Sequence, residues 1–94
     1  MVQVERDFNL RIGFAVRRLR EQKNLDQRRL AAIAGVTQGS VAHIEKGRRC
    51  SINTLVKLAD ALGVKFSALV ERAENVREPE LVFRDLRRKG IIGS

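Results

Sequence analysis

The sequence predicts an all-α protein, and three features indicate this class. Its apolar residues are mostly Leu, Ile, Val and Ala, whereas aromatic residues make up only 4% of the chain. Proline occurs once in 94 residues. Apolar side chains recur every three or four residues, which is the period of a helix with one buried face. Short packed helices suit this composition better than a β-sandwich does.

The first expected helix spans residues 8–23. One stripe of it is apolar and is expected to face the core: Phe8, Ile12, Ala15, Val16 and Leu19. Asn24 then stands where a residue that tolerates the left-handed conformation ends a helix. Residues 1–7 are expected to form an N-terminal arm.

A second helix is expected over residues 27–34, "QRRLAAIA". Asp26 is placed to cap its start, and Gly35 marks its end. Within this helix, Leu30 and Ala34 are expected to face inward.

The third helix is expected to start after Thr37, a good N-cap, and to run to about Lys46 before Gly47 stops it. At about 100° per residue, one side of this helix carries Val41, Ile44 and Glu45. The opposite side carries small or polar residues, namely Gly39, Ala42, His43 and Lys46. The helix therefore has a narrow inner face and a small, polar outer face.

Two further helices complete a bundle over residues 8–74. Ser51 can cap a fourth helix, in which the inward-facing residues are Leu55, Leu58, Ala59 and Leu62, and Gly63 ends it. The pattern continues into a fifth helix through Phe66, Leu69, Val70 and Ala73. Five short helices with such tight connections pack around one core.

The C-terminal tail, residues 75–94, is expected to contain another short helix. Its apolar stripe is formed by Val82, Phe83 and Leu86. A lone helix of about ten residues is marginal in water, so this stripe must be buried against another surface. Leu10 and Phe14, four residues apart and opposite the core stripe, offer a counterpart in the same subunit or in a partner subunit. Alternatively, these two residues are ordinary scattered surface hydrophobics.

The charge of the chain favours an anionic partner but does not prove one. The formal net charge is +8, and the first 50 residues hold 11 basic and five acidic side chains. A solvated surface would explain this charge as well as nucleic-acid binding would. One cysteine excludes an intramolecular disulfide, and no apolar run reaches the ~18 residues that span a bilayer. The N-terminus lacks the order of a signal peptide, so a cytoplasmic protein is expected.

The third helix sharpens this interpretation. A helix that only needed solubility would more often carry Glu and Lys on its outer face. Gly39 and Ala42 instead permit another surface to approach the helix backbone closely, and Gln38, Ser40 and His43 surround that gap with short hydrogen-bonding groups. The major groove of DNA, about 12 Å wide, accepts such a helix.

These residues belong to a longer pattern, "RLREQKNLDQRRLAAIAGVTQGSVAHIEKGRRCSINTLVKLADALGV". It resembles the XRE-type helix-turn-helix family, which includes the phage lambda repressor and Cro proteins. The matching elements are "LR", "LDQ", "LA", "AGV", Thr37, "IEKG" and "LADALGV", and the resemblance covers roughly residues 8–72. It implies a lambda-repressor-like bundle in which the third helix lies in the major groove.

The resemblance also implies roles for individual residues. The expected base-reading residues are Gln38, Gly39, Ser40 and His43, although Ser40 occupies a position that meets either phosphate or a base. Gly39 replaces a long polar side chain of many relatives, so one base contact is expected to be missing or made through water. The expected phosphate-binding residues, taken from the matches and from neighbouring basic side chains, are Gln27, Arg28, Lys46, Arg48, Arg49 and Asn53. Arg20 and Glu45 match an ion pair that joins helices one and three.

The sequence thus predicts a DNA-binding transcriptional regulator, a repressor acting as a homodimer on a pseudo-palindromic operator. An antitoxin-like subunit, whose tail binds a toxin protein and which autoregulates by binding DNA, is the main alternative. A third is an architectural DNA-binding protein without sequence preference. No enzyme is expected, because the chain offers no nucleophile–base pair and no Gly-rich phosphate loop. No cofactor or metal site is expected either, because the single His and the single Cys lie on different faces.

Overall fold

The computed structural model describes residues 2–76, with side chains from residue 7 onward, and over this range the chain forms five α-helices and no strand. Their bounds are α1 Val2–Gln22, α2 Gln27–Ala34, α3 Gln38–Glu45, α4 Ile52–Ala61 and α5 Phe66–Glu74. The predicted all-α class and five-helix bundle are therefore confirmed. The helix expected in the tail, with its stripe of Val82, Phe83 and Leu86, lies outside the described residues.

The first helix starts earlier than expected, because α1 begins at Val2, within the segment 1–7 that was expected to form an N-terminal arm. This segment contains neither Pro nor Gly, so nothing in its sequence interrupts the helix near its start. Asp7 Oδ2 also accepts a hydrogen bond from Arg11 Nε at 2.8 Å, and such an i, i+4 pair supports a helix. At its other end α1 stops at Gln22, one residue earlier than expected.

The predicted helix ends rest on local capping. Three of the N-cap residues bond through their side chains: Asp26, Thr37 and Ser51 each accept a hydrogen bond from the backbone N–H three residues on, at 2.7, 3.0 and 3.1 Å respectively. Asn24 and Gly35 were expected to adopt the left-handed conformation, and their φ angles are 57° and 73°. The starts of α2, α3 and α4 and the stops of α1 and α2 therefore follow from residues next to those helix ends, whereas α5 starts after Lys65 without a side-chain cap.

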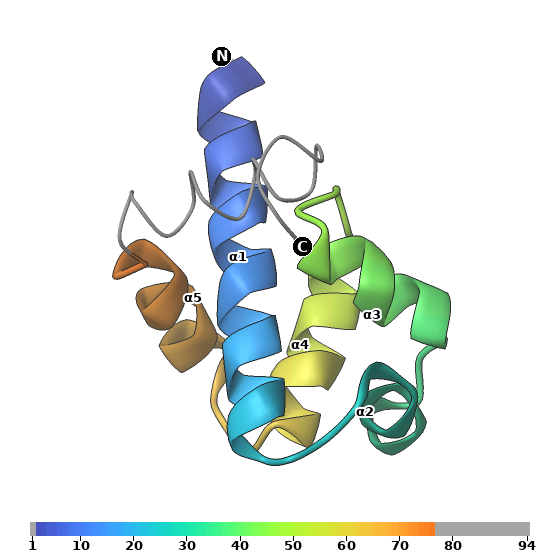
Figure 1. The fold of residues 1–94 in the computed structure, drawn as a ribbon. Coiled ribbons are helices and arrows are strands. Elements are labelled where there is room, and N and C mark those ends of the chain that lie inside the picture. The colour runs from blue at the N-terminus through green and yellow to red at the C-terminus, as the bar shows by residue number, and fades with distance from the viewer. Residues whose placement is uncertain (1, 77–94) are drawn as a thin grey trace, which may run out of the picture.

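All five helices contribute to one core. Its largest fully buried side chains are Ile12, Leu30, Ile44, Leu58, Leu62, Leu69, Val16 and Val41. Four expected core residues lie further out, because Phe66 and Val70 on α5 are half-buried and Phe8 and Ala34 are also more exposed than expected. Phe8 is 39% exposed, because the start of α1 extends past its neighbours in Figure 1. Ala34 is only half-buried, and Ala31 takes the inner position on α2.

Helix α1 is the central element of the bundle. It packs against α5 and against α3, while α2 packs against α3 and α4. In Figure 1, α5 lies on one side of α1, and the α2–α3 pair lies on the other. The α2–α3 pair is thus held by α1, which packs against α3, and by α4, which packs against α2.

Candidate nucleic-acid interface

The turn between α2 and α3 is short and rigidly bonded. Gly35 adopts the left-handed conformation, and its backbone N–H donates to Ala31 O. The N–H of Val36 donates to the same carbonyl at 3.0 Å. Thr37 then caps α3. Because every step of the turn is hydrogen-bonded, α3 leaves α2 at a defined angle.

Helix α3 has the two faces that the sequence predicts. Val41, Ile44 and Glu45 are buried, with exposed fractions of 0%, 1% and 4%. Of the expected base-reading residues, Gln38, Gly39 and His43 are exposed and Ser40 is half-buried. The Ser40 hydroxyl lies 2.9 Å from Thr37 Oγ1, so part of its hydrogen-bonding capacity serves the cap. The outer face is therefore accessible, small and polar.

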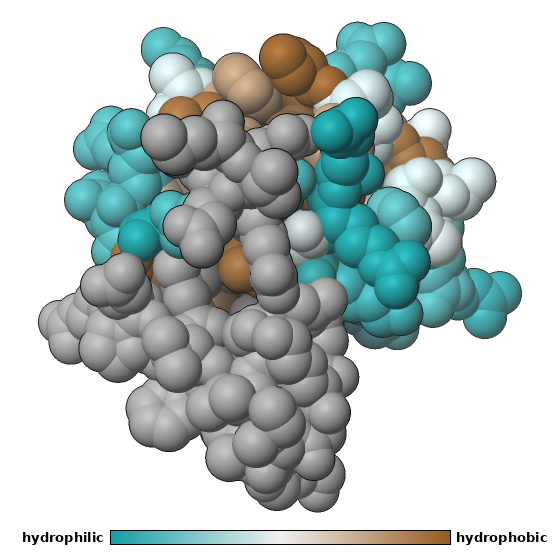
Figure 2. Space-filling view, turned by 90° about the horizontal axis from the view of Figure 1, so that it is seen from above, coloured by the Kyte–Doolittle hydropathy of each residue, from teal (hydrophilic) through white to brown (hydrophobic). Residues whose placement is uncertain are grey.

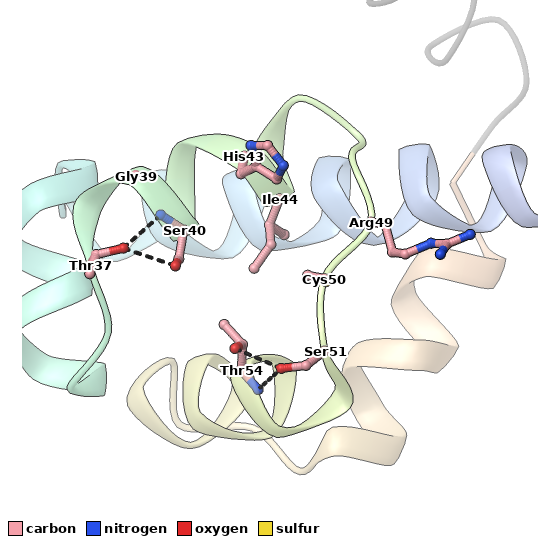
Figure 3. A pocket seen from close by; sticks show the side chains of 9 residues that line it. All are labelled: Thr37, Gly39, Ser40, His43, Ile44, Arg49, Cys50, Ser51 and Thr54. Atoms are coloured by element: carbon pink, nitrogen blue, oxygen red, sulfur yellow. Dashed lines mark hydrogen bonds between the residues drawn. The ribbon is translucent and has the colours of Figure 1, made fainter.

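A shallow hollow of about 480 Å³ separates the outer part of α3 from the start of α4 (Figure 3). It brings together four of the expected DNA-contacting residues, namely Gly39, Ser40, His43 and Arg49. Ser51 and Thr54, which sequence reasoning did not assign to the interface, also line it and bond to each other at 2.9 Å. The S-x-x-T spacing at the start of α4 could have indicated them. Hydroxyl groups of Ser40, Ser51 and Thr54 thus lie beside α3, whereas the Arg49 side chain points away from the hollow in Figure 3.

The remaining expected phosphate-binding residues do not line this hollow. Arg28, Lys46, Arg48 and Asn53 are all exposed. Gln27 is half-buried, and its Nε2 donates to Glu45 Oε1 at 3.1 Å, so its bond is made within the protein. On the face seen in Figure 2, hydrophilic residues lie on both sides, and smaller groups of hydrophobic residues lie between them. Three cationic side chains among these residues are therefore exposed on or next to the helix-turn-helix: Arg28 on α2, and Lys46 and Arg48 directly after α3.

A buried ion pair holds α3 against α1. Arg20 Nε donates to Glu45 Oε2 at 2.7 Å and Arg20 Nη2 donates to Glu45 Oε1 at 3.0 Å. The third arm of the guanidinium, Nη1, donates to Leu25 O at 2.7 Å. The hydrogen bond to Glu45 raises the pKa of Arg20 above its ordinary value, against the opposing effect of burial. With Gln27 as a further donor, the Glu45 carboxylate joins α1, α2 and α3.

A second contact between α1 and α3 was not anticipated from the sequence. A Cβ added to Gly13 would overlap the backbone carbonyl oxygen of Ile44, and it would come within 3.2 Å of the Ile44 carbonyl carbon. The two helices can therefore approach this closely only because residue 13 has no side chain. An isolated glycine inside an apolar helical stripe is the signal that could have shown it. Gly13 thus helps to set the position of the recognition helix.

Leu10 and Phe14, the expected interface pair on α1, make contacts within the bundle. Leu10 and Phe14 are both half-buried. A Cβ on Gly47 would come within 2.5 Å of Leu10 Cδ2, so Leu10 lies against the loop that follows α3. The Arg18 guanidinium carbon lies 5.7 Å from the centroid of the Phe14 ring, a cation–π distance.

Other kinds of site receive no support from residues 2–76. Within that range there is no cluster of His, Cys, Asp or Glu that could hold a metal ion. The helices described there include none that is long and apolar enough to span a membrane. Cys50 is half-buried, and this burial raises the pKa of its thiol. A raised pKa leaves less thiolate at neutral pH, which argues against a reactive cysteine.

Comparison with known proteins gives consistent matches. The helix-turn-helix family model matches residues 16–69. The chain is 32% identical over 77 residues to the HTH-type transcriptional regulator PuuR of Escherichia coli, covering 81% of this chain and 42% of PuuR. It is 30% identical over 81 residues to the immunity repressor protein of Bacillus phage phi105, covering 85% of this chain and 56% of that protein. The chain therefore spans about half the length of these two relatives.

A solved structure shows the same architecture. The clp gene regulator ClgR from Corynebacterium glutamicum matches with a TM-score of 0.70 and 26% sequence identity. The match covers 87% of this chain and 88% of the ClgR chain.

Proposed function

The chain belongs to the XRE-type helix-turn-helix family, and from this premise we propose that it is a sequence-specific transcriptional repressor that binds double-stranded DNA as a homodimer on a pseudo-palindromic operator. The observation that carries the proposal is the outer face of α3, where Gln38, Gly39 and His43 are exposed. The exposed Lys46 and Arg48 follow it directly along the chain. The names of the relatives, a transcriptional regulator and an immunity repressor, support the same function.

The proposed division of labour follows from side-chain chemistry. Gln38, at the exposed start of α3, has an amide that can donate to N7 and accept from N6 of adenine. His43, one turn further along, can reach a second base edge. Lys46 and Arg48 follow α3 and are exposed, so they are suited to hold the phosphate backbone and to fix the register. Gly39 permits the close approach that these contacts require.

A second copy is proposed because one helix of eight residues supplies too few base contacts for an operator. Two apolar residues on α4 support it. Ile52 is 67% exposed and Val56 is 43% exposed, and they are four residues apart on one side of the helix. Ile52 adjoins Ser51, which lines the hollow beside α3, so a partner docked here would lie next to the DNA-facing side. Ile52→Asp should weaken dimerisation measured by sedimentation without DNA. Ile33→Asp, at a site 56% exposed on α2, is the matched control.

Selection of bound sites from random double-stranded DNA tests the function directly. We expect two related half-sites in inverted orientation, with centres about 10 base pairs or a multiple of this distance apart. Recovery of a single half-site would refute the dimeric arrangement. If no sequence is enriched, the proposal of specific binding fails, and the architectural alternative explains the basic surface.

A further inference from the structure

A second groove lies between α1 and the end of α5, and none of its lining residues comes from α2, α3 or α4. Its volume is about 450 Å³. It is lined by Phe14, Arg18 and Gln22 from α1, and by Arg72, Asn75 and Val76 from the end of α5 and the residues after it. An aromatic ring therefore lies in a groove that carries two cationic side chains.

The described chain ends inside this groove. Val76 lines the groove and is only 9% exposed. Its carbonyl oxygen accepts a hydrogen bond from Arg11 Nη1 at 2.6 Å, while Arg11 Nε is held by Asp7 at 2.8 Å. The backbone is thus bound to α1 at the point where it leaves α5. The described part of the chain therefore ends beside α1.

The segment that follows has a composition that suits the groove. Glu78 and Glu80 come within four residues of Val76, close enough along the chain to face Arg18 and Arg72. The apolar stripe of Val82, Phe83 and Leu86 comes next, and a short amphipathic segment needs a surface to bury such a stripe.

The distances permit docking within one subunit. The six residues from Val76 to Val82 span at most ~21 Å when extended. Phe14 lines the same groove as Val76, and Leu10 lies one turn further along α1, a rise of about 6 Å. The stripe can therefore reach both residues of its own chain without any rearrangement of the bundle.

We infer that residues 77–94 dock in the α1–α5 groove of their own subunit, with Phe83 against Phe14 and the two glutamates near Arg18 and Arg72. This inference goes beyond the proposed function, because it assigns the tail to bracing α1 and α5 and not to the operator or to the dimer. It leaves the exposed face of α3 clear for DNA.

Nuclear Overhauser effects between aromatic rings test the inference on the full chain. The chain has four phenylalanines, Phe8, Phe14, Phe66 and Phe83, so their ring signals can be resolved by selective labelling. We expect a contact between the rings of Phe14 and Phe83, and none between Phe83 and Phe66 at the far end of α5. Absence of the Phe14–Phe83 contact would overturn the inference. In a mixture of labelled and unlabelled protein, an isotope-filtered contact between subunits would assign the groove to a second copy instead.

A double-mutant cycle in urea gives an independent readout. Phe14→Ala and Phe83→Ala should be coupled by about two- to tenfold in the unfolding equilibrium constant, the range for a packed aromatic pair. Phe8→Ala is the matched control, because Phe8 is an α1 phenylalanine that does not line the groove. Phe8→Ala and Phe83→Ala should act independently, so their effects on the unfolding equilibrium constant should multiply. If Phe8→Ala and Phe14→Ala are coupled to Phe83→Ala to the same extent, the docking is contradicted.

Discussion

Gly13→Ala should destabilise the protein, although the same change usually stabilises a helix. At an ordinary helical position, replacing Gly by Ala is favourable by about 1 kcal/mol. At position 13 the new Cβ would overlap Ile44 O and come within 3.3 Å of the Glu45 carbonyl carbon. These are backbone atoms of α3, so no side chain can rotate away, and α1 and α3 must move apart.

The loss of stability expected for Gly13→Ala is the difference between two opposing effects. Overpacking of a well-packed interior costs about 1–3 kcal/mol, and a clash with backbone belongs at the upper end of that range. After the gain of about 1 kcal/mol in helix propensity, a net loss of about 1–2 kcal/mol in the free energy of unfolding remains. For a chain of this size, such a loss lowers Tm by roughly 5–15 °C. Circular dichroism during thermal and urea unfolding measures both quantities.

Gly39→Ala is the matched control on α3. The nearest atom to its added Cβ is Thr37 Oγ1 at 3.8 Å, and the residue is exposed. This variant should be as stable as the wild type or more stable by up to about 1 kcal/mol. It should nevertheless bind the selected operator more weakly, since the close approach to DNA is lost. If Gly13→Ala unfolds at or above the wild-type temperature, the argument that α1 and α3 touch through residue 13 is refuted.

Three further changes separate the roles of the interface residues. Gln38→Ala should weaken DNA binding by ~1–3 kcal/mol and remove the base preference at one position of each half-site. If a repeated selection shows unchanged base preferences, Gln38 does not read a base. Replacing Lys46 and Arg48 by Ala should weaken binding to all sequences alike and reduce the salt slope by ~1 per lost contact, which titration at several salt concentrations measures; a sequence-selective loss would contradict the phosphate assignment. Arg20→Ala should lower the free energy of unfolding by ~3–5 kcal/mol, because it removes the cation from the buried Glu45 carboxylate and leaves only the neutral donor of Gln27 among the bonds described. A double-mutant cycle without coupling would exclude a stabilising pair.

The features that could be predicted from the sequence are those set by neighbouring residues. Asp26, Thr37 and Ser51 cap helices through bonds to the third residue along the chain, so their role can be seen in a short window. The buried and exposed faces of α3 follow from its period alone. Arg20 and Glu45 are 25 residues apart, and only the family resemblance brought them together.

The features that were missed depend on how separate helices meet. The contact of Gly13 with Ile44 exists because α1 crosses α3 at that residue; the isolated glycine indicates a close approach, but no local pattern specifies which helix it meets. The bond from Arg11 to Val76 spans 65 residues for the same reason. Helix α1 starts earlier than residue 8 because a helix can continue through polar residues, whereas the expected start was judged only from apolar ones.

The contacts on the inner side of α3 explain how its position is fixed although its outer surface is polar. Three groups hold it from the inner side: the buried Val41 and Ile44, the close approach at Gly13, and the carboxylate of Glu45. None of them projects on the outer side, where Gln38, Gly39 and His43 are exposed. Substitutions on the outer face should therefore change DNA recognition with little effect on folding, whereas changes at the inner contacts should alter stability first. The separation arises because a helix of eight residues directs anchoring and reading side chains in opposite directions.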